Sequence, residues 1–465
     1  MEKAHGASPR RPADALGMAP EEMRRLGHLV VDLVVDHFET RADGPAIQQS
    51  TPEELRAVLG GPVPRVPGDA DAAIRTLVGT ALANMQHGDH PRYFARVPGP
   101  SSFAAVLGEW LATGHNAIAT SWGGGSGPTT VELVVIDWLR ELLGMPDGTE
   151  GILVSGGSLA NLTAFAAARA ELGDGVVYLT DQTHSSIPRG LRALGFPPDR
   201  VRVLRSDGGL RMPVGELAAA VAADRAAGRR PVMVVATAGT TNTGAVDPLP
   251  EIADLCRAEG MWFHVDGAYG APAALSAAGA AALVGIERAD SLVIDPHKWL
   301  FQPYDVGCVL VRRPGALERA FSIDAEYLRD TSAAGGEVNL RDRSLELSRR
   351  SRALKLWLTF TVHGVEGIRS AIARGIALAE FAEGRLRADP MWEVVTPARL
   401  GVVTFALIHG ADGTHAARAA ALATSGYAAV TSTTVRGRSV LRLCTINPAT
   451  TEDDIVRTLD RLAAP

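Results

Sequence analysis

Cysteine is scarce in this sequence, which has three among its 465 residues. Cys256, Cys308 and Cys444 lie far apart and form no C-x-x-C pair, so the spacing argues against a disulfide framework and against a zinc site. The chain also lacks any run of about 18 consecutive apolar residues, and no apolar signal-peptide segment occurs near its start. We therefore expect a cytoplasmic protein with no metal and no membrane partner.

Basic charge is not in excess either. The formal net charge is −6 and the isoelectric point is about 6.1, so nucleic acid is not expected as a partner. The hydrophobic share of 46% and the charged share of 21% are typical of a globular protein in water. A chain of 465 residues is too long for one simple core, which predicts a large domain with smaller pieces around it.

The first 89 residues divide into a tail and an arm. Residues 1–18 are polar and rich in proline, glycine and alanine, which predicts a disordered tail. Residues 19–89 are predicted to form a helical arm, with a helix starting at Pro20 and short helices at 52–59 and 72–85. The first helix carries apolar residues at helical spacing, namely Met23, Leu26, Val30, Leu33, Val34 and Phe38. Because its own subunit can hardly bury this face, we expect the arm to contact a second subunit.

Apolar strands alternate with helical stretches over residues 90–360. This order predicts an α/β domain with a mostly parallel sheet, covered by helices on both faces. The predicted strands are residues 151–154, 176–180, 232–237, 262–266 and 291–294. Residues 307–311 are a candidate for a further strand, in the antiparallel direction because the connection from Lys298 is short. Residues 361–465 are predicted to form a small α+β domain after a helix at about 354–388, with strands at 402–407, 428–431 and 440–445 and helices at 414–424 and 452–463.

The most informative stretch is residues 291–299. Residues 291–294 form a short apolar run, and Pro296, which cannot donate to a sheet ladder, ends it. His297 and Lys298 are thereby placed at the carboxyl edge of a strand, where open α/β sheets build their sites. Apolar neighbours are expected to lower the pKa of the Lys298 amine and to leave it neutral for attack on a carbonyl, as in a Schiff base. The alternative is a lysine whose stem lies on apolar surface while its head reaches water.

Three more polar features follow predicted strands. Residues 155–161 join a strand to a helix and include Gly157 and Ser158, which predicts a phosphate cradle; a purely structural turn is the alternative. Asp266 ends an apolar strand, where its carboxylate needs a cation such as a protonated pyridine, unless it caps a helix. His184 follows another strand, from which it can lie flat against a planar ring and offer a proton, unless it is an exposed loop residue.

In chain order, a phosphate cradle, a histidine, an aspartate and a lysine describe pyridoxal 5′-phosphate held at four points. The chain resembles the pyridoxal-phosphate-dependent group II amino-acid decarboxylases, which include aromatic-L-amino-acid, histidine and glutamate decarboxylases. The resemblance covers nearly the whole sequence and rests on residues 90–94, 121–122, 155–158, 181–186, 237–241, 264–266, 295–299 and 447–448. It implies a fold-type I enzyme that forms a homodimer with a shared active site and converts an L-amino acid into its amine and CO2.

The resemblance also implies roles for individual residues. Lys298 forms the Schiff base with the cofactor, Asp266 keeps the pyridine nitrogen protonated, and His184 stacks on the ring. Tyr327 matches a mobile-loop tyrosine that returns a proton to the α-carbon, and Arg442 matches an arginine that pairs with a substrate carboxylate. The other positions implied to touch the cofactor are Gly157, Ser158, Thr241, Ala268, Ser291, Asp295 and His297, of which Gly157, Ser158 and Ser291 are implied to hold the phosphate.

The sequence departs from the family pattern in the expected substrate pocket. Arg96-Val97-Pro98-Gly99 stands where the enzymes for aromatic acids have an aromatic pair before Pro-Thr. Thr120 stands where the family supplies an aromatic residue from the second subunit. We therefore expect a more polar pocket, with tryptophan, tyrosine or dopa as the default substrate and a smaller or polar amino acid as the alternative. The alternative to a place in the substrate pocket is that Arg96 forms a salt bridge on the surface.

Two other kinds of function remain open at this point. One is a different enzyme on the same cofactor: an aldehyde synthase, an aminotransferase or another lyase. The other is a cofactor-binding protein without activity, against which the presence of all the implied catalytic residues argues. Tyr327 and His184 favour plain decarboxylation, because proper return of a proton yields amine rather than aldehyde.

Overall fold

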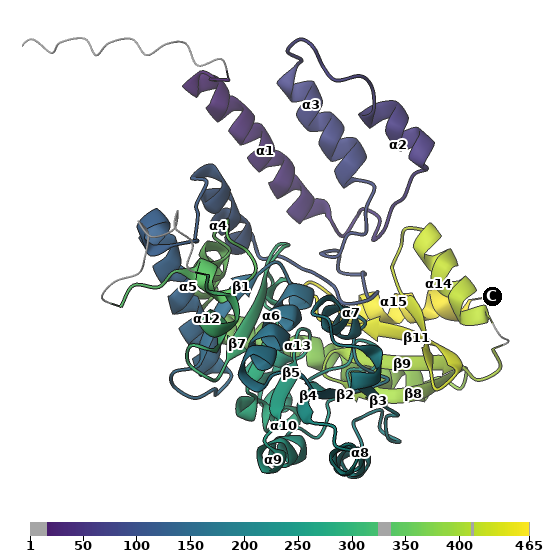
Figure 1. Cartoon of the computed structure of the whole chain (residues 1–465). Coiled ribbons are helices and arrows are strands. Elements are labelled where there is room, and N and C mark those ends of the chain that lie inside the picture. The colour runs from purple at the N-terminus through teal and green to yellow at the C-terminus, as the bar shows by residue number, and fades with distance from the viewer. Residues whose placement is uncertain (1–15, 324–335, 411–412, 465) are drawn as a thin grey trace, which may run out of the picture.

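The computed structural model describes residues 16–323, 336–410 and 413–464. Figure 1 shows a large domain built on a seven-stranded sheet, a smaller C-terminal domain, and a helical arm that stands away from both. The strands of the large sheet lie in the order β1-β7-β6-β5-β4-β2-β3. Their bounds are Glu150–Val154 (β1), Val176–Thr180 (β2), Val201–Leu204 (β3), Pro231–Thr237 (β4), Trp262–Asp266 (β5), Ser291–Ile294 (β6) and Gly307–Val311 (β7).

All strands of this sheet except β7 run in one direction. β3, β2, β4, β5 and β6 pair in parallel, whereas β7 is antiparallel to both β6 and β1. The mostly parallel sheet and the antiparallel strand at 307–311 are thus confirmed. Strand β3 was not predicted, because arginine interrupts its apolar residues and its place at the sheet edge leaves them partly exposed.

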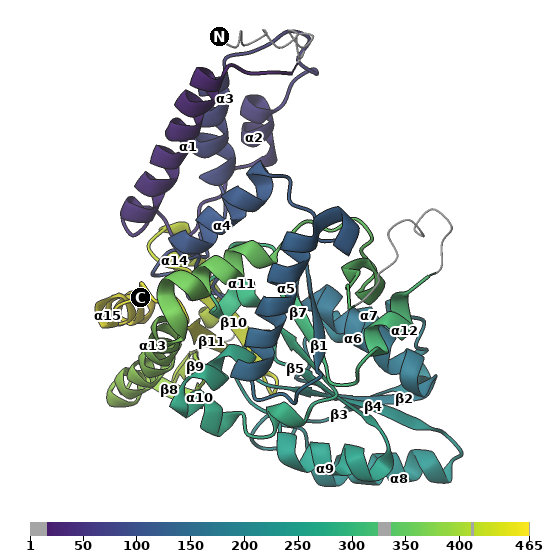
Figure 2. The same cartoon turned by 90° about the vertical axis from the view of Figure 1, so that its left-hand side faces the viewer.

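Helices cover both faces of the large sheet, because successive side chains of each strand point to opposite sides. Val154 belongs to the core on one face and Leu153 to the core on the other. The helices of the first face are α6 (Gly157–Leu172), α7 (Ser186–Ala193) and α12 (Ala316–Phe321). Those of the second face include α5 (Trp122–Leu142), α8 (Val214–Ala226) and α9 (Leu249–Glu259). Figure 2 shows α8 and α9 side by side along one edge of the large domain.

The C-terminal domain is an antiparallel sheet in the order β10-β11-β9-β8, which confirms the α+β prediction. Its elements are β8 (Trp392–Arg399), β9 (Val402–Leu407), α14 (Thr414–Thr424), β10 (Thr431–Val435), β11 (Arg438–Cys444) and α15 (Glu452–Ala463). The strand predicted at 428–431 is wrong over most of its length. Ala429 instead forms a single bridge with Tyr93, and the regular ladder begins at Thr431. Strand β8 was not predicted.

One long helix joins the two domains. Helix α13 (Ala353–Ala388) packs on α4 (Phe103–Gly114) and on α5 near its start, and on β8 near its end. It bends at Gly364, where φ is 63°. The boundary expected between residues 360 and 361 lies four residues before this bend.

The N-terminal arm consists of α1 (Pro20–Thr40), α2 (Pro52–Leu59), α3 (Ala70–Thr76) and a π-helical turn (Leu77–Leu82). Figures 1 and 2 both show it projecting from the rest of the chain. Leu26 is the one buried side chain of α1. Several large apolar side chains of the arm are exposed, among them Met23, Val30, Leu77 and Leu82. Within the described residues this apolar surface thus has no cover.

Two further observations concern the described ranges as a whole. None of the helices in them combines the length and the apolar character that a membrane crossing requires. The same ranges contain no group of three or more acidic, histidine or cysteine side chains arranged to hold a metal ion. All three cysteines are free and buried.

Candidate active site

A cavity of about 400 Å³ lies at the carboxyl ends of the parallel strands of the large sheet. Each of β1, β2, β4, β5 and β6 delivers its last residue, or a residue just beyond it, to this cavity. The lining residues are Ser155, Gly156, Gly157, Ser158, Leu159, Asn161, His184, Ser186, Thr237, Gly239, Thr241, Asp266, Ala268, Tyr269, Asp295, His297 and Lys298.

Lys298 lies one turn into the short helix α11 (Pro296–Trp299), which begins where Pro296 ends β6. Its Nζ lies 2.8 Å from Asp295 Oδ2. Burial acts to lower the pKa of the Lys298 amine, but the carboxylates of Asp295 and Asp266 outweigh it and raise the pKa above its ordinary value. The prediction of a lowered pKa is therefore wrong, because it counted the apolar neighbours of Lys298 and not the charges of Asp295 and Asp266.

Asp266 ends β5 with a side chain that is 5% exposed. Its Oδ1 accepts a hydrogen bond from the backbone N–H of Ala268 at 3.1 Å. Burial raises the pKa of Asp266 above its usual value, although the positive charge of Lys298 acts in the opposite direction. A buried carboxylate of this kind is suited to a cationic ligand that restores its ionised form.

The turn between β1 and α6 is shaped for an anion. A β-carbon on Gly157 would lie 2.8 Å from Asp295 Oδ2, so no side chain fits between this turn and the floor of the cavity. Helix α6 begins at Gly157 without a side-chain cap, which leaves the N–H groups of its first turn open. These groups and the hydroxyls of Ser155 and Ser158 give the cavity a cluster of hydrogen-bond donors.

His184 lies between β2 and α7 and lines the cavity, where its Nδ1 is 2.8 Å from the hydroxyl of Ser186. His297 lies deeper, and its Nδ1 donates to the carbonyl of Val306 at 2.6 Å. Burial lowers the pKa of His297, although the charge of Asp295 acts in the opposite direction. Nε2 lies 3.6 Å from Asp295 Oδ2.

The residues of the cavity fit pyridoxal 5′-phosphate. Two buried polar atoms, Asp295 Oδ1 and Thr237 Oγ1, have no hydrogen-bond partner among the described residues and are therefore open to a ligand. An amine, a buried acid and an open helix N-terminus surround one space, which matches an aldehyde, a protonated pyridine and a phosphate.

Ser291 is the predicted cofactor contact that the structure does not bring to the cavity. It is the first residue of β6, at the opposite end of the strand from Asp295. Its buried hydroxyl accepts from Trp262 Nε1 at 2.7 Å and pairs with His264 Nδ1 at 2.8 Å. The expected phosphate contact is therefore corrected: Ser291 supports the His264 ring, whose Nε2 lies 2.8 Å from Asn161 Oδ1.

The predicted substrate residues Arg442 and Arg96 do not line the cavity. Arg442 is 2% exposed, and its Nη1 donates to the backbone carbonyl of Arg96. The side chain of Arg96 is on the surface and donates to Gln86 Oε1 at 2.9 Å. Arg442 Nε and Nη2 are buried without a hydrogen-bond partner among the described residues, and the expected contact with a substrate carboxylate stays a prediction.

The other predicted substrate residues also lie outside the cavity of their own chain. Val97 packs against the core of the large domain, and Gly99 lies against the ring of Tyr304. The Thr120 hydroxyl accepts from the backbone N–H of Arg349 at 3.1 Å. Tyr327 lies outside the described residues.

Eight of the lining residues were not singled out as site residues from the sequence: Ser155, Gly156, Leu159, Asn161, Ser186, Thr237, Gly239 and Tyr269. Asn161 and Thr237 belong to motifs that the sequence analysis recognised. Thr237 ends β4 and Asn161 lies one turn into α6, and these positions at the cavity edge of the sheet could have indicated that both line the site. Tyr269 stacks on Trp299 with ring centroids 5.3 Å apart. No local pattern predicts that contact, because it joins two separate strand ends.

A mostly parallel sheet with a lysine, a buried aspartate and an anion cradle at its carboxyl edge defines a pyridoxal-phosphate enzyme of fold-type I. Residues 52–408 match the family described as "Pyridoxal-dependent decarboxylase conserved domain". The chain belongs to this family of pyridoxal-dependent decarboxylases.

Individual relatives are similar over nearly the full length. The aromatic-L-amino-acid decarboxylase of Bacillus atrophaeus is 42% identical over 97% of each chain. The phenylacetaldehyde synthase of Arabidopsis thaliana is 32% identical, over 95% of this chain and 94% of its own. A crystal structure of Oryza sativa TDC with PLP and tryptamine superposes with a TM-score of 0.91 at 28% identity, over 98% of each chain.

Proposed function

We propose that this protein removes the carboxyl group of an aromatic L-amino acid and releases the amine and CO2. The observation that carries the proposal is the convergence of Lys298, Asp266 and His184 on one cavity beside an anion cradle. The similarity to a bacterial aromatic-L-amino-acid decarboxylase supports the substrate class.

In the proposed decarboxylation, the side chains of the cavity would each have a separate role. Lys298 would hold the cofactor aldehyde through its amine, whose Nζ lies 2.8 Å from Asp295 Oδ2. Asp266 would keep the ring nitrogen protonated, and the first turn of α6 with Ser158 would hold the phosphate. When bound, pyridoxal phosphate supplies the electron sink for the pair left by the departing CO2. His184, which lines the same cavity, would pack on the cofactor ring.

The other predicted cofactor contacts are assigned by their places in the cavity. Asp295 Oδ2 contacts the Lys298 amine and lies 3.6 Å from His297 Nε2, so His297 would act on the amine through Asp295. Thr241 and Ala268 line the cavity and would border the cofactor ring. Tyr327 is proposed to return the proton to the α-carbon; this role is supported by its sequence context alone.

A panel of the twenty amino acids plus dopa tests the proposed function. We expect release of CO2 and of the matching amine in equal amounts from tryptophan, tyrosine or dopa, without aldehyde or peroxide. Equal amounts follow if every carbon centre that loses CO2 regains a proton. Aldehyde, ammonia and oxygen consumption would instead identify an aldehyde synthase, the activity named for the Arabidopsis thaliana relative. Turnover of a smaller or polar amino acid alone would leave the reaction but reject the aromatic substrate.

The N-terminal arm is proposed to build a homodimer that completes the active site. Its apolar side chains at Leu77 and Leu82 are 54% and 55% exposed, which is costly for a lone subunit. The loop at 96–99 and Thr120 also lie outside the cavity of their own chain, which is consistent with a role at the site of a second copy. Light scattering is expected to give twice the chain mass of 48.8 kDa.

Charge placed on the arm should break this dimer. The double variant Leu77→Glu and Leu82→Glu is expected to be a folded monomer with little activity, because two carboxylates cannot be buried in an apolar interface. Val284→Glu is the matched control, since Val284 is 60% exposed on the large domain, away from the arm. An active wild-type monomer, or a double variant that stays dimeric, would contradict the proposal.

The cytoplasmic location is likewise proposed. It is supported by the three cysteines, all of which are free and buried as thiols.

A further inference from the structure

Tyr304 is an exposed aromatic residue beside the active-site cavity. Its side chain is 61% exposed, although it follows Lys298 by six residues. Its ring packs on His297, a lining residue of the cavity, with centroids 4.6 Å apart and planes inclined by 38°. Although most of the side chain is exposed, desolvation by the neighbouring residues raises the pKa of Tyr304, with Lys298 acting to lower it and Asp295 to raise it. The hydroxyl therefore keeps its proton at neutral pH.

The hydroxyl end of Tyr304 points to the loop that precedes α4. A β-carbon on Gly99 would lie 2.9 Å from both the hydroxyl oxygen and Cε2 of Tyr304. The two residues are thus in direct contact, and the absence of a side chain at Gly99 makes room for the phenol. The ring bridges the space between His297 and the segment at 96–99.

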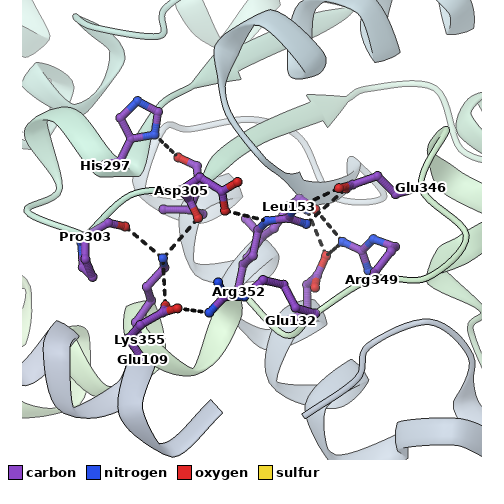
Figure 3. A network of polar contacts seen from close by, with 12 residues as sticks. Glu109, Glu132, Leu153, His297, Pro303, Asp305, Glu346, Arg349, Arg352 and Lys355 are labelled. Atoms are coloured by element: carbon purple, nitrogen blue, oxygen red, sulfur yellow. Dashed lines mark hydrogen bonds and ion pairs between the residues drawn. The ribbon is translucent and has the colours of Figure 1, made fainter. Parts of the chain in front are cut away.

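The backbone on both sides of Tyr304 is held by buried polar contacts, which Figure 3 shows. Lys355 Nζ donates to the carbonyl of Pro303 at 2.9 Å and to the carbonyl of Asp305 at 3.1 Å. Arg352 Nε donates to Asp305 Oδ1 at 3.3 Å. Both side chains are almost fully buried, so releasing the loop would cost them these hydrogen bonds, although Lys355 would keep Glu109 and Arg352 would keep Glu346. Tyr304 is therefore presented by a rigid loop.

The hydroxyl of Tyr304 has no hydrogen-bond partner among the residues that the structure describes. A tyrosine with a purely structural role usually buries its ring and satisfies its hydroxyl. In Tyr304 the ring is exposed and hydrogen bonds hold the flanking backbone. Its hydroxyl, which can donate and accept a hydrogen bond, lies next to the cavity that contains the Lys298 amine. These features together are those of a ligand contact.

We propose that Tyr304 is a specificity-determining residue, and that its hydroxyl forms a hydrogen bond with the ring hydroxyl of a phenolic or catecholic L-amino acid. This inference rests on the proposed function and narrows its substrate class. An indole or an unsubstituted phenyl ring would leave the Tyr304 hydroxyl without this partner. Lys355 and Arg352 are positioning residues, because they act on Tyr304 through the loop backbone and through Asp305.

The test compares the wild type with Tyr304→Phe on L-tyrosine and L-phenylalanine. We expect kcat/KM for L-tyrosine to fall about 10-fold, through KM rather than kcat, as for the loss of one hydrogen bond. The value for L-phenylalanine should stay within about 2-fold, because the ring that packs on His297 is retained. Tyr427→Phe is the matched control: Tyr427 packs between Arg92 and Arg461, and neither arginine lines the cavity.

A second readout does not need decarboxylation. The methyl esters of L-tyrosine and L-phenylalanine cannot release CO2, and their binding is followed by the change in visible absorption of the cofactor. In Tyr304→Phe the Kd of the tyrosine ester is expected to rise about 10-fold relative to that of the phenylalanine ester. Equal changes for both esters, or no change for either, would overturn the inference. A wild type that binds the esters selectively but decarboxylates neither amino acid would refute the proposed function and leave the inference standing.

Discussion

Lys298→Ala is expected to lose the visible absorption band of the cofactor-loaded protein and at least about 10³-fold in turnover, because Lys298 is the one amine among the residues that line the cavity. The sequence makes the assignment unusually easy to test, since the chain contains three lysines, Lys3, Lys298 and Lys355. Borohydride reduction of the loaded wild type, followed by peptide mapping, should label the peptide that contains Lys298.

Lys355 provides the matched control for this experiment. It is buried and its Nζ is held by two backbone carbonyls and by Glu109 at 3.0 Å, so it is not free to reach the cofactor. Borohydride reduction of the cofactor-loaded Lys355→Arg variant should therefore still label Lys298. Label on Lys355 or Lys3 of the wild type would remove Lys298 from its central role, and the proposed chemistry with it.

Asp266→Asn is expected to keep the cofactor bound but to lower turnover by about 10²- to 10³-fold, because an amide cannot hold a proton on the ring nitrogen. The stability of the cofactor-free protein should not fall. Burial raises the folded-state pKa of Asp266, so its ionised carboxylate destabilises the fold above the unfolded pKa, and asparagine removes that charge. Turnover and thermal unfolding of the cofactor-free variant are the measurements.

Asp224 on α8 is a contrasting control. Hydrogen bonds from Arg202 hold the pKa of this buried carboxylate well below its usual range. Its ionised form therefore adds stability above the unfolded pKa, and this stability is lost as the pH falls through the folded pKa. Asp224→Asn should lower the unfolding temperature at neutral pH while kcat stays unchanged. Near-normal turnover in Asp266→Asn, or a loss of stability that parallels Asp224→Asn, would show that Asp266 has a structural role instead.

Local sequence patterns were sufficient for most helices and buried strands. The helices at 52–59 and 452–463 have the predicted bounds, and each begins with a capping box, Thr51 with Glu54 and Thr451 with Asp454. The strands at 176–180, 262–266 and 291–294 have the predicted bounds as well, since each is a short apolar run ended by polar residues. Edge strands such as β3 were not predicted, because their residues are only partly buried and their apolar pattern is weak.

The sequence by itself also determined which polar residues meet at the cavity. Parallel strands end on one edge of a sheet, so residues that follow such strands, including His184, Asp266 and Lys298, converge whatever the order of the strands. The tertiary structure decided what depends on neighbours distant in the chain. Ser291 is at the far end of its strand, Arg442 is covered by the loop at Arg96, and the pKa of Lys298 rises instead of falling. Burial and charge at one atom are sums over all surrounding segments, and a local pattern contains only one of those segments.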